Sequence, residues 1–274
     1  MSLDLSQVLL FGALLLAAGA VAGITAGLLG VGGGIVIVPV LWHLFSALGI
    51  DEDVRMHVAV GTSLASIIAT SVSSVRSHHK RGAVDFTLLK SWGPWIFIGV
   101  LCGTALASYV RGPVLSAVFA TVALVVSLHM GFAKPEWRLA ESLPKGAPKA
   151  LLAGTIGTIS AMMGIGGGTL SVPILSLFGY PIHRAVGTAA AIGFIIGIPG
   201  AIGFVLAGWN VPGLPPFSLG YISLIGFALI FPTSTLLAPY GAKLAHGLNT
   251  RNLKRVFAVF LGFTALRMFY DLLT

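Results

Sequence analysis

Two glycine-rich segments, each followed by a proline, carry the clearest chemical pattern in this chain. They read GVGGGIVIVP from Gly30 and GIGGGTLSVP from Gly164. Glycine lets the backbone bend and approach a ligand closely, and proline suits the first turn of a helix. The free N–H groups and the dipole at a helix start attract anions, so the pattern predicts two broken helices that hold an anion through backbone donors. The glycines concerned are Gly32, Gly33, Gly34, Gly166, Gly167 and Gly168.

Close helix packing is the alternative role for these glycines, because small residues let membrane helices approach one another. A nucleotide-phosphate loop is excluded, since no acidic residue follows at the expected distance and no Lys-Ser/Thr pair closes the loop. The duplication of the segment together with its proline favours the broken-helix interpretation.

Side chains that can donate a hydrogen bond follow each glycine-rich segment. HVAVGTSLA begins at His57 and HRAVGTAAA begins at His183. Each histidine is expected just before an apolar helix, where it either caps that helix or binds a proton or an anion. The hydroxyls within the two helices either donate to the anion or bond back to their own helix. They belong to Thr62, Ser63 and Thr188.

Two further hydroxyls lie within the second glycine-rich segment itself. Thr169 and Ser171 alternate there with apolar residues, whereas the first segment has Ile35 and Ile37 at the matching positions. If the segment is extended, both hydroxyls face one side. The two halves then contribute unequally to one substrate site.

Neither a metal centre nor a cofactor is predicted. Cys102, the only cysteine, lies in an apolar segment, and the seven histidines are dispersed. No carboxylate lies at the centre of an apolar segment, which disfavours a cation as substrate because cation transporters usually carry one there. A membrane-embedded enzyme and a scaffold protein remain as weaker alternatives to a protein that binds and moves an anion.

The composition places these residues inside a membrane. Of 274 residues, 56% are hydrophobic and 9% are charged, whereas an ordinary soluble domain has about 25% charged residues. So few charges cannot cover a soluble surface, and the sequence therefore predicts an all-α polytopic membrane protein. The net charge of +8 lies in short loops, where it orients the chain, and nucleic acid is not an expected partner.

The chain consists of two related halves. Nineteen residues from Gly23 align without gaps on nineteen from Gly157, with eight identities, and the later motifs follow in the same order. We therefore predict a first transmembrane repeat at 1–133, a cytoplasmic linker at 134–149 and a second repeat at 150–274. The apolar stretches 150–163 and 169–180 are too short to span about 30 Å of hydrocarbon. Each repeat is expected to be a glycine-broken helical hairpin followed by three spans.

The loop charges predict that the two repeats have inverted topology. RSHHKRG in the first half is basic and its counterpart GWNVPGLPP is not, whereas GAKLAHGLNTRNLKR in the second half is more basic than its counterpart. Basic loops stay on the cytoplasmic side, so both termini are predicted outside the cell (inner) membrane. Inverted repeats are typical of secondary transporters, which bind substrate between the repeats.

The duplicated GxGGGxxxxP segment, the AVGT motifs, RGAVDF and GWNVPGLPPFSLGYI together resemble the TauE/SafE family of membrane permeases over nearly the whole chain. The resemblance implies a secondary transporter that exports small sulfur-containing anions such as sulfite, sulfoacetate or other sulfonates. Uptake of an organic sulfonate or a carboxylate remains the alternative. The expected partners are that anion and the lipid bilayer. A proton as coupling ion, through His57 or His183, and a homo-oligomer stay open.

Overall fold

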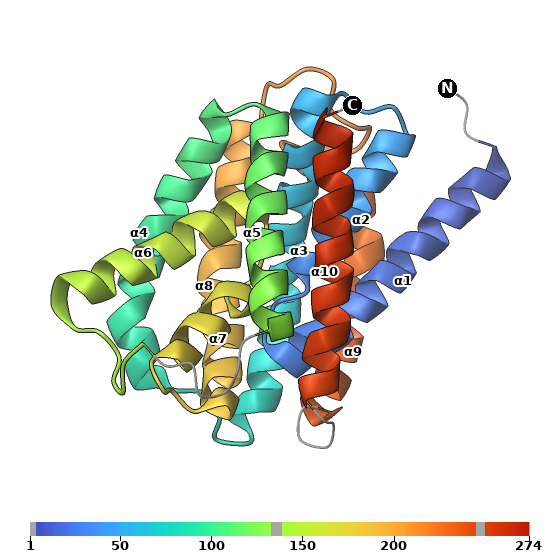
Figure 1. Ribbon diagram of the computed structural model, residues 1–274. Coiled ribbons are helices and arrows are strands. Elements are labelled where there is room, and N and C mark those ends of the chain that lie inside the picture. Colours follow the sequence, from blue (N-terminus) through green and yellow to red (C-terminus); the bar gives the residue numbers. More distant parts are fainter. Residues whose placement is uncertain (1–3, 133–138, 245–249, 274) are drawn as a thin grey trace.

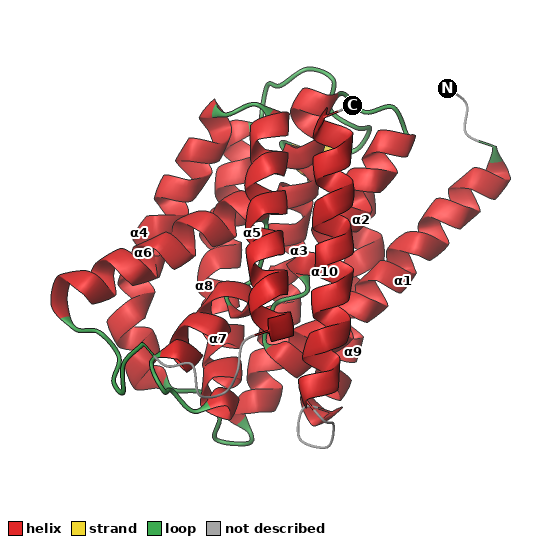
Figure 2. Cartoon of the chain, in the orientation of Figure 1, coloured by secondary structure: helices red, strands yellow, loops and turns green. Residues whose placement is uncertain are grey.

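Ten helices make up the part of the chain that the structure describes, residues 4–132, 139–244 and 250–273 of a computed structural model (Figures 1 and 2). The first five are α1 (Leu5–Leu29), α2 (Gly34–Ala47), α3 (Glu52–His79), α4 (Phe86–Tyr109) and α5 (Gly112–Phe132). The second five are α6 (Gly146–Met163), α7 (Gly168–Leu177), α8 (Ile182–Ala207), α9 (Leu224–Leu244) and α10 (Thr250–Leu273). A short antiparallel pair, β1 (Ser218–Leu219) and β2 (Ile222–Ser223), lies between α8 and α9. The predicted all-α polytopic fold is confirmed.

In the part of the chain that the structure describes, six helices are long and apolar enough to cross a membrane: α1, α3, α4, α5, α8 and α9. Helix α2 has 14 residues and α7 has 10. At 1.5 Å per residue they reach about 21 and 15 Å, short of a hydrocarbon layer of about 30 Å. The second hairpin therefore contains a short arm, as its sequence predicts, although its first helix begins at Gly146 rather than at residue 150.

Capping residues, rather than apolar runs, set several helix boundaries. The Asp51 carboxylate accepts the N–H of Asp53 and thereby starts α3 at Glu52, ahead of the apolar run that begins at Val58. At their C-termini, helices α1 and α6 end at Gly30 and Gly164, which adopt the left-handed conformation, each with φ of 67°. Both glycine-rich segments thus begin by ending a helix.

The helix contacts follow a reciprocal pattern between the first five helices and the second five. Helix α1 packs along α9 and α6 packs along α4, while α3 packs against α8 and α5 against α10. Exchanging α1–α5 with α6–α10 in order turns the α1–α9 pair into the α6–α4 pair and leaves the α3–α8 and α5–α10 pairs unchanged. Helices α5 and α10 run in opposite directions, as do α3 and α8 (Figure 1). The most buried spans are α3 and α8, which carry the two AVGT motifs.

Charged residues differ between the two ends of the bundle. Helix α1 begins and α10 ends at the same end (Figure 1), where the acidic residues Asp51–Asp53 also lie. The opposite end, here called the basic end, holds the loop after α3 with Lys80 and Arg81, and the end of α9 with Lys243. Part of the predicted linker 134–149 lies outside the described residues.

Candidate functional site

The two glycine-rich segments meet inside the bundle, backbone against backbone. A β-carbon on Gly34 would lie 2.2 Å from the carbonyl oxygen of Gly164, and one on Gly168 would lie 2.1 Å from that of Gly30. Such distances leave no room for a side chain. The start of each short helix therefore lies on the end of the long helix from the other half, and packing is one role of these glycines.

Helix α7 begins at this junction with buried polar groups around it. The first N–H groups of a helix have no partner within it, and the carbonyl of Gly167 accepts the first bond, from the N–H of Ser171. Thr169 is 3% exposed, and its hydroxyl has no hydrogen-bond partner among the described residues. Because Cα–Cβ bonds tilt toward the helix start, this hydroxyl lies at the same end as the unbonded amides.

The second hydroxyl of this segment is also buried and unpartnered, but it points elsewhere. Ser171 is 1% exposed, and the segment that holds it is helical from Gly168. Residues two apart on a helix differ by about 200° in direction. The segment is therefore not extended, and Thr169 and Ser171 do not face one side.

Another hydroxyl that sequence reasoning missed lies beside the same helix start. Ser71 of α3 is 1% exposed and has no hydrogen-bond partner among the described residues. A β-carbon on Gly193 would lie 2.6 Å from the Ser71 hydroxyl and 3.6 Å from the amide nitrogen of Gly167. The hydroxyl and the amide therefore face the same small space, which exists because residue 193 is a glycine.

The two glycine-rich segments differ in the polarity of the side chains that follow their glycines. Ser63 donates its hydroxyl to the carbonyl oxygen of Gly164 at 2.7 Å, whereas its counterpart in the second half is Ala189. Ile35 and Ile37 stand where the second segment has its two hydroxyls, and both isoleucines are buried. The start of α7 thus carries two hydroxyls where the start of α2 carries isoleucines, and the Ser63 bond lies on the α2 side, because the Gly164 carbonyl faces Gly34.

The matched threonines of the AVGT motifs accept hydrogen bonds from backbone N–H groups of the opposite half. The Thr62 hydroxyl accepts the N–H of Ser223 at 2.9 Å, and the Thr188 hydroxyl accepts the N–H of Asp85 at 2.9 Å. Both threonines are fully buried, so each hydroxyl satisfies a backbone donor that has little access to water. The two predicted ligand hydroxyls therefore act as structural acceptors in this conformation.

The two predicted histidines lie in different environments. His57 is 3% exposed inside α3, with its Nδ1 3.0 Å from the carbonyl oxygen of Asp53 and its Nε2 2.9 Å from that of Ala107. Its ring stacks on Tyr221 with centroids 4.8 Å apart. His183 instead lies exposed in the first turn of α8. His57 therefore links α3 to one of the last carbonyl groups of α4, a contact typical of a residue that caps the end of a helix.

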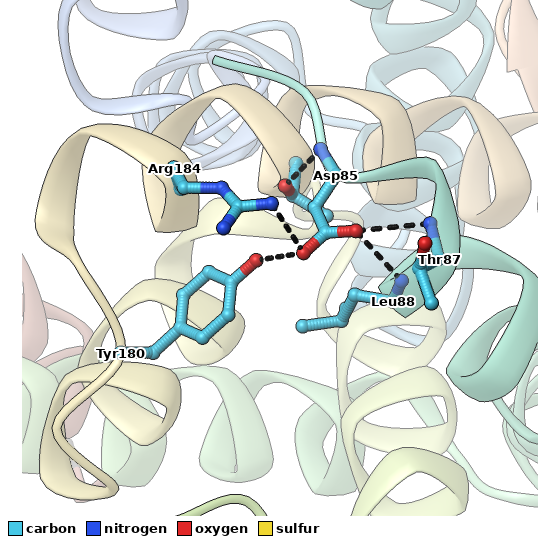
Figure 3. Close-up of polar contacts among 6 residues, drawn as sticks. Asp85, Thr87, Leu88, Tyr180 and Arg184 are labelled. Atoms are coloured by element: carbon cyan, nitrogen blue, oxygen red, sulfur yellow. Dashed lines mark hydrogen bonds and ion pairs between the residues drawn. The ribbon is translucent and has the colours of Figure 1, made fainter.

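At the basic end, a charged cluster links the two halves and was not predicted from the sequence. One carboxylate oxygen of Asp85 accepts the hydroxyl of Tyr180 at 2.5 Å and a guanidinium N–H of Arg184 at 2.8 Å (Figure 3). The guanidinium also lies 5.7 Å from the centre of the Tyr180 ring. The RGAVDF stretch indicates that Asp85 starts a helix, but nothing local indicates these partners. The Arg184 charge is neutralised in this conformation.

The cluster changes the acidity of two of its members. Burial alone raises the pKa of the Asp85 carboxyl, but the Tyr180 hydrogen bond, the Arg184 charge and the N–H groups of Leu88 and Thr87 together outweigh it and hold the pKa below its usual value. Burial and the neighbouring carboxylate raise the pKa of Tyr180 to about 12. At neutral pH the cluster therefore contains an ionised Asp85 and a protonated Tyr180.

The site offers hydrogen-bond donors without a charged catalytic group. Among the described residues, no three His, Cys, Asp or Glu side chains lie close enough together to hold a metal ion. Helix-start amides and hydroxyls are hydrogen-bond donors, the kind of group from which an anion accepts. The fold and the site together define a multi-pass helical membrane protein with two glycine-broken hairpins that meet inside the bundle.

The chain belongs to the sulfite exporter TauE/SafE family, whose model matches residues 15–268. A probable membrane transporter protein of Haemophilus influenzae is 36% identical over 260 residues, which cover 93% of this chain and 97% of that protein. One of Methanocaldococcus jannaschii is 27% identical over 93% of this chain and 94% of its own. One of Bacillus subtilis is 32% identical over 71% and 78% respectively. No solved structure matches the chain.

Proposed function

We propose that this protein is a secondary transporter that exports small sulfur-containing anions, such as sulfite, sulfoacetate or other sulfonates. The observation that carries the proposal is the buried start of α7, which has no side-chain cap and lies at the same end as the unpartnered hydroxyl of Thr169. A buried hydroxyl without a partner costs about 1–3 kcal/mol, which a hydrogen bond from that hydroxyl to a bound anion would recover. Family membership and the names of the relatives support transport, and the family description supports sulfite.

The anion binds between two inverted repeats in this proposal. The reciprocal helix pairs support inversion, as do the opposite directions of α5 and α10 (Figure 1). The exchange of glycine contacts between Gly34 and Gly164, and between Gly168 and Gly30, supports it at the centre. Because α7 carries the hydroxyls of Thr169 and Ser171 where α2 carries isoleucines, the anion lies closer to the start of α7 than to the start of α2.

The basic end faces the cytoplasm in this proposal, and both termini lie outside. Cationic loops at one end and Asp51–Asp53 at the other support this orientation. A negative cytoplasmic potential then drives an anion outward with about 2.3 kcal/mol per charge per 100 mV. Outward flux of a monoanion therefore needs no further energy source than the membrane potential.

Thermal unfolding of the purified protein tests the substrate class. We expect sulfite, sulfoacetate or taurine to raise the melting temperature above that measured with acetate at equal ionic strength, because a ligand that binds only the folded state stabilises it. Sulfate and thiosulfate test the preference among sulfur anions. If no sulfur anion changes the melting temperature, the proposed substrate class is wrong.

Flux in oriented vesicles tests direction separately from binding. We expect efflux from the side of the basic end to exceed influx under a negative interior potential. Single cysteines at positions 80 and 51 in a Cys102→Ser background report the orientation, and labelling of position 80 from outside intact cells would contradict it. Anion binding with inward flux would leave the site in place and assign uptake instead.

A further inference from the structure

A basic hollow lies between α3 and α9 where both helices end. Its volume is about 390 Å³, and it is lined by Ser77, Lys80, Arg81, Pro239, Tyr240 and Lys243. The hollow is separate from the junction of the glycine-rich segments, which is buried inside the bundle. Neither the AVGT motifs nor the Asp85 cluster contributes a residue to it.

Among the carboxylates of the described residues, none pairs with the three cations of this hollow. None of the three ion pairs in the described ranges includes Lys80, Arg81 or Lys243. Arg81 donates an N–H to the carbonyl oxygen of Ala242 at 2.8 Å, which fixes the loop after α3 against the end of α9. Lys80 and Lys243 remain exposed. The hollow therefore presents a positive charge that an anion can neutralise.

The surface next to the hollow is apolar and belongs to a membrane span. Leu236 and Tyr240 of α9 are 70% and 63% exposed, and Leu244 follows them at 42%. Helix α9 is one of the six helices suited to crossing a membrane, so these side chains face lipid. Tyrosine is common at the level of lipid head groups. An anion with apolar chains attached matches this combination better than a free inorganic anion does.

We propose that this hollow binds the phosphate head group of an anionic phospholipid, with its acyl chains along α9. Basic pockets between transmembrane helices are suited to such head groups. Ser73 of α3 donates to the carbonyl oxygen of Thr235 at 2.9 Å, so the two helices that form the hollow are already joined within the membrane. A bound lipid would extend this contact to the basic end and link the two halves there.

Native mass spectrometry and thermal unfolding of the purified protein in detergent test this site. We expect phosphatidylglycerol to bind more tightly than phosphatidylcholine and to raise the melting temperature. The variant Lys80→Gln/Lys243→Gln leaves the Arg81 bond intact and should weaken phosphatidylglycerol binding about 30-fold, which corresponds to about 1 kcal/mol for each cation. The matched control Lys90→Gln/Lys145→Gln removes two cations from the same end outside the hollow and should retain wild-type affinity.

Three results would overturn the lipid assignment. Equal weakening by the control variant would mean that only the general charge of the basic end attracts lipid. A shift by inorganic phosphate equal to that by phosphatidylglycerol would assign the hollow to a free anion. Equal binding of both lipids would remove the anionic preference. If the double variant does not fold, Lys243→Gln alone should weaken binding about fivefold, and unchanged binding would contradict the site.

Discussion

The Cα atom of Gly166 lies 2.9 Å from the position that a β-carbon on Gly32 would occupy, and the reverse distance is 2.8 Å. The two residues hold matching places in the two glycine-rich segments. Each therefore excludes a side chain on the other. The junction is consequently a contact of two bare backbones, and its geometry depends on both segments at once.

Alanine at the flanking glycines should destabilise the protein. Gly34→Ala and Gly168→Ala each place a β-carbon within about 2.2 Å of a carbonyl oxygen, an overlap that costs about 1–3 kcal/mol or more. We expect the melting temperature to fall by several degrees, measured in detergent. Gly12→Ala is the control, because nothing lies within 4 Å of its β-carbon position. A wild-type melting temperature in both site variants would contradict the described junction.

Valine at position 169 should separate binding from stability. Thr169→Val keeps the side-chain shape and removes a buried hydroxyl that has no partner, so stability should stay the same or rise. The melting-temperature shift caused by sulfite should shrink or disappear. Thr155→Val is the control, because that hydroxyl bonds to its own helix and is remote from the site. An unchanged sulfite shift in Thr169→Val would remove this hydroxyl from the proposed site.

The AVGT threonines should matter for stability. Thr62→Val and Thr188→Val each leave a backbone N–H, of Ser223 or Asp85, without its acceptor, which costs about 1–3 kcal/mol where that donor is buried. Thr104→Val provides a buried control, since its hydroxyl donates only to carbonyls of its own helix. Unfolding should occur at lower temperature in the first two variants. Equal stability of all three would show that the cross-half bonds are unimportant.

Asparagine at position 85 should weaken the link between the halves at the basic end. Asp85→Asn keeps a helix cap but loses the negative charge that Arg184 and Tyr180 bind. We expect a loss of about 2 kcal/mol at neutral pH. The folded-state pKa of Asp85 is lowered, so this contribution is present above the ordinary aspartate range and is lost as the pH falls below about 4.

A suitable control for this charge is Asp53→Asn. That carboxylate pairs with Arg111, whose side chain is 78% exposed, and an exposed pair contributes little. Melting curves from pH 7 to about 3 should show the wild type and Asp85→Asn converging, while Asp53→Asn follows the wild type throughout. A constant difference between wild type and Asp85→Asn would mean that the ionised carboxylate is not what stabilises the cluster.

Phenylalanine at position 180 should reduce sensitivity to alkali. The folded-state pKa of Tyr180 is raised to about 12 from 10.0, so its contribution to stability is complete below pH 10 and disappears as the pH rises toward 12. The wild type should therefore lose more melting temperature across this interval than Tyr180→Phe does. Tyr240→Phe serves as the comparison, because Tyr240 is largely exposed. A parallel decline in all three proteins would contradict the buried contact with Asp85.

The sequence predicts the helices well because apolar runs and capping residues are local properties. The hairpin arms around both glycine-rich segments and the shortness of α7 follow from run length alone. The start of α3 is mispredicted because its first turn is charged and begins at the Asp51 cap. The unequal polarity of the two segments is likewise visible in the sequence, because Ile35 and Ile37 align with Thr169 and Ser171.

The contacts between the halves are not visible in the sequence. Asp85 and Arg184 are 99 residues apart, and neither residue type indicates the other as its partner. The condition that would place Thr169 and Ser171 on one side, an extended segment, is not met, because the helix resumes directly after the glycines, whose packing against the other half sets where α7 begins. Ser71 is missed because its place beside the site depends on packing between helices. Its hydroxyl adjoins the amide of Gly167 only because Gly193 has no side chain.

The exchange of partners between the halves has a consequence for how the protein is made. Ser63 finds its acceptor at Gly164, and Thr62 receives its N–H from Ser223, so both bonds await residues synthesised much later. During insertion into the membrane, the Ser63 bond cannot form until the chain has passed residue 164, and the Thr62 bond cannot form until it has passed residue 223. The native packing of the first half is therefore completed only after most of the second half has been synthesised.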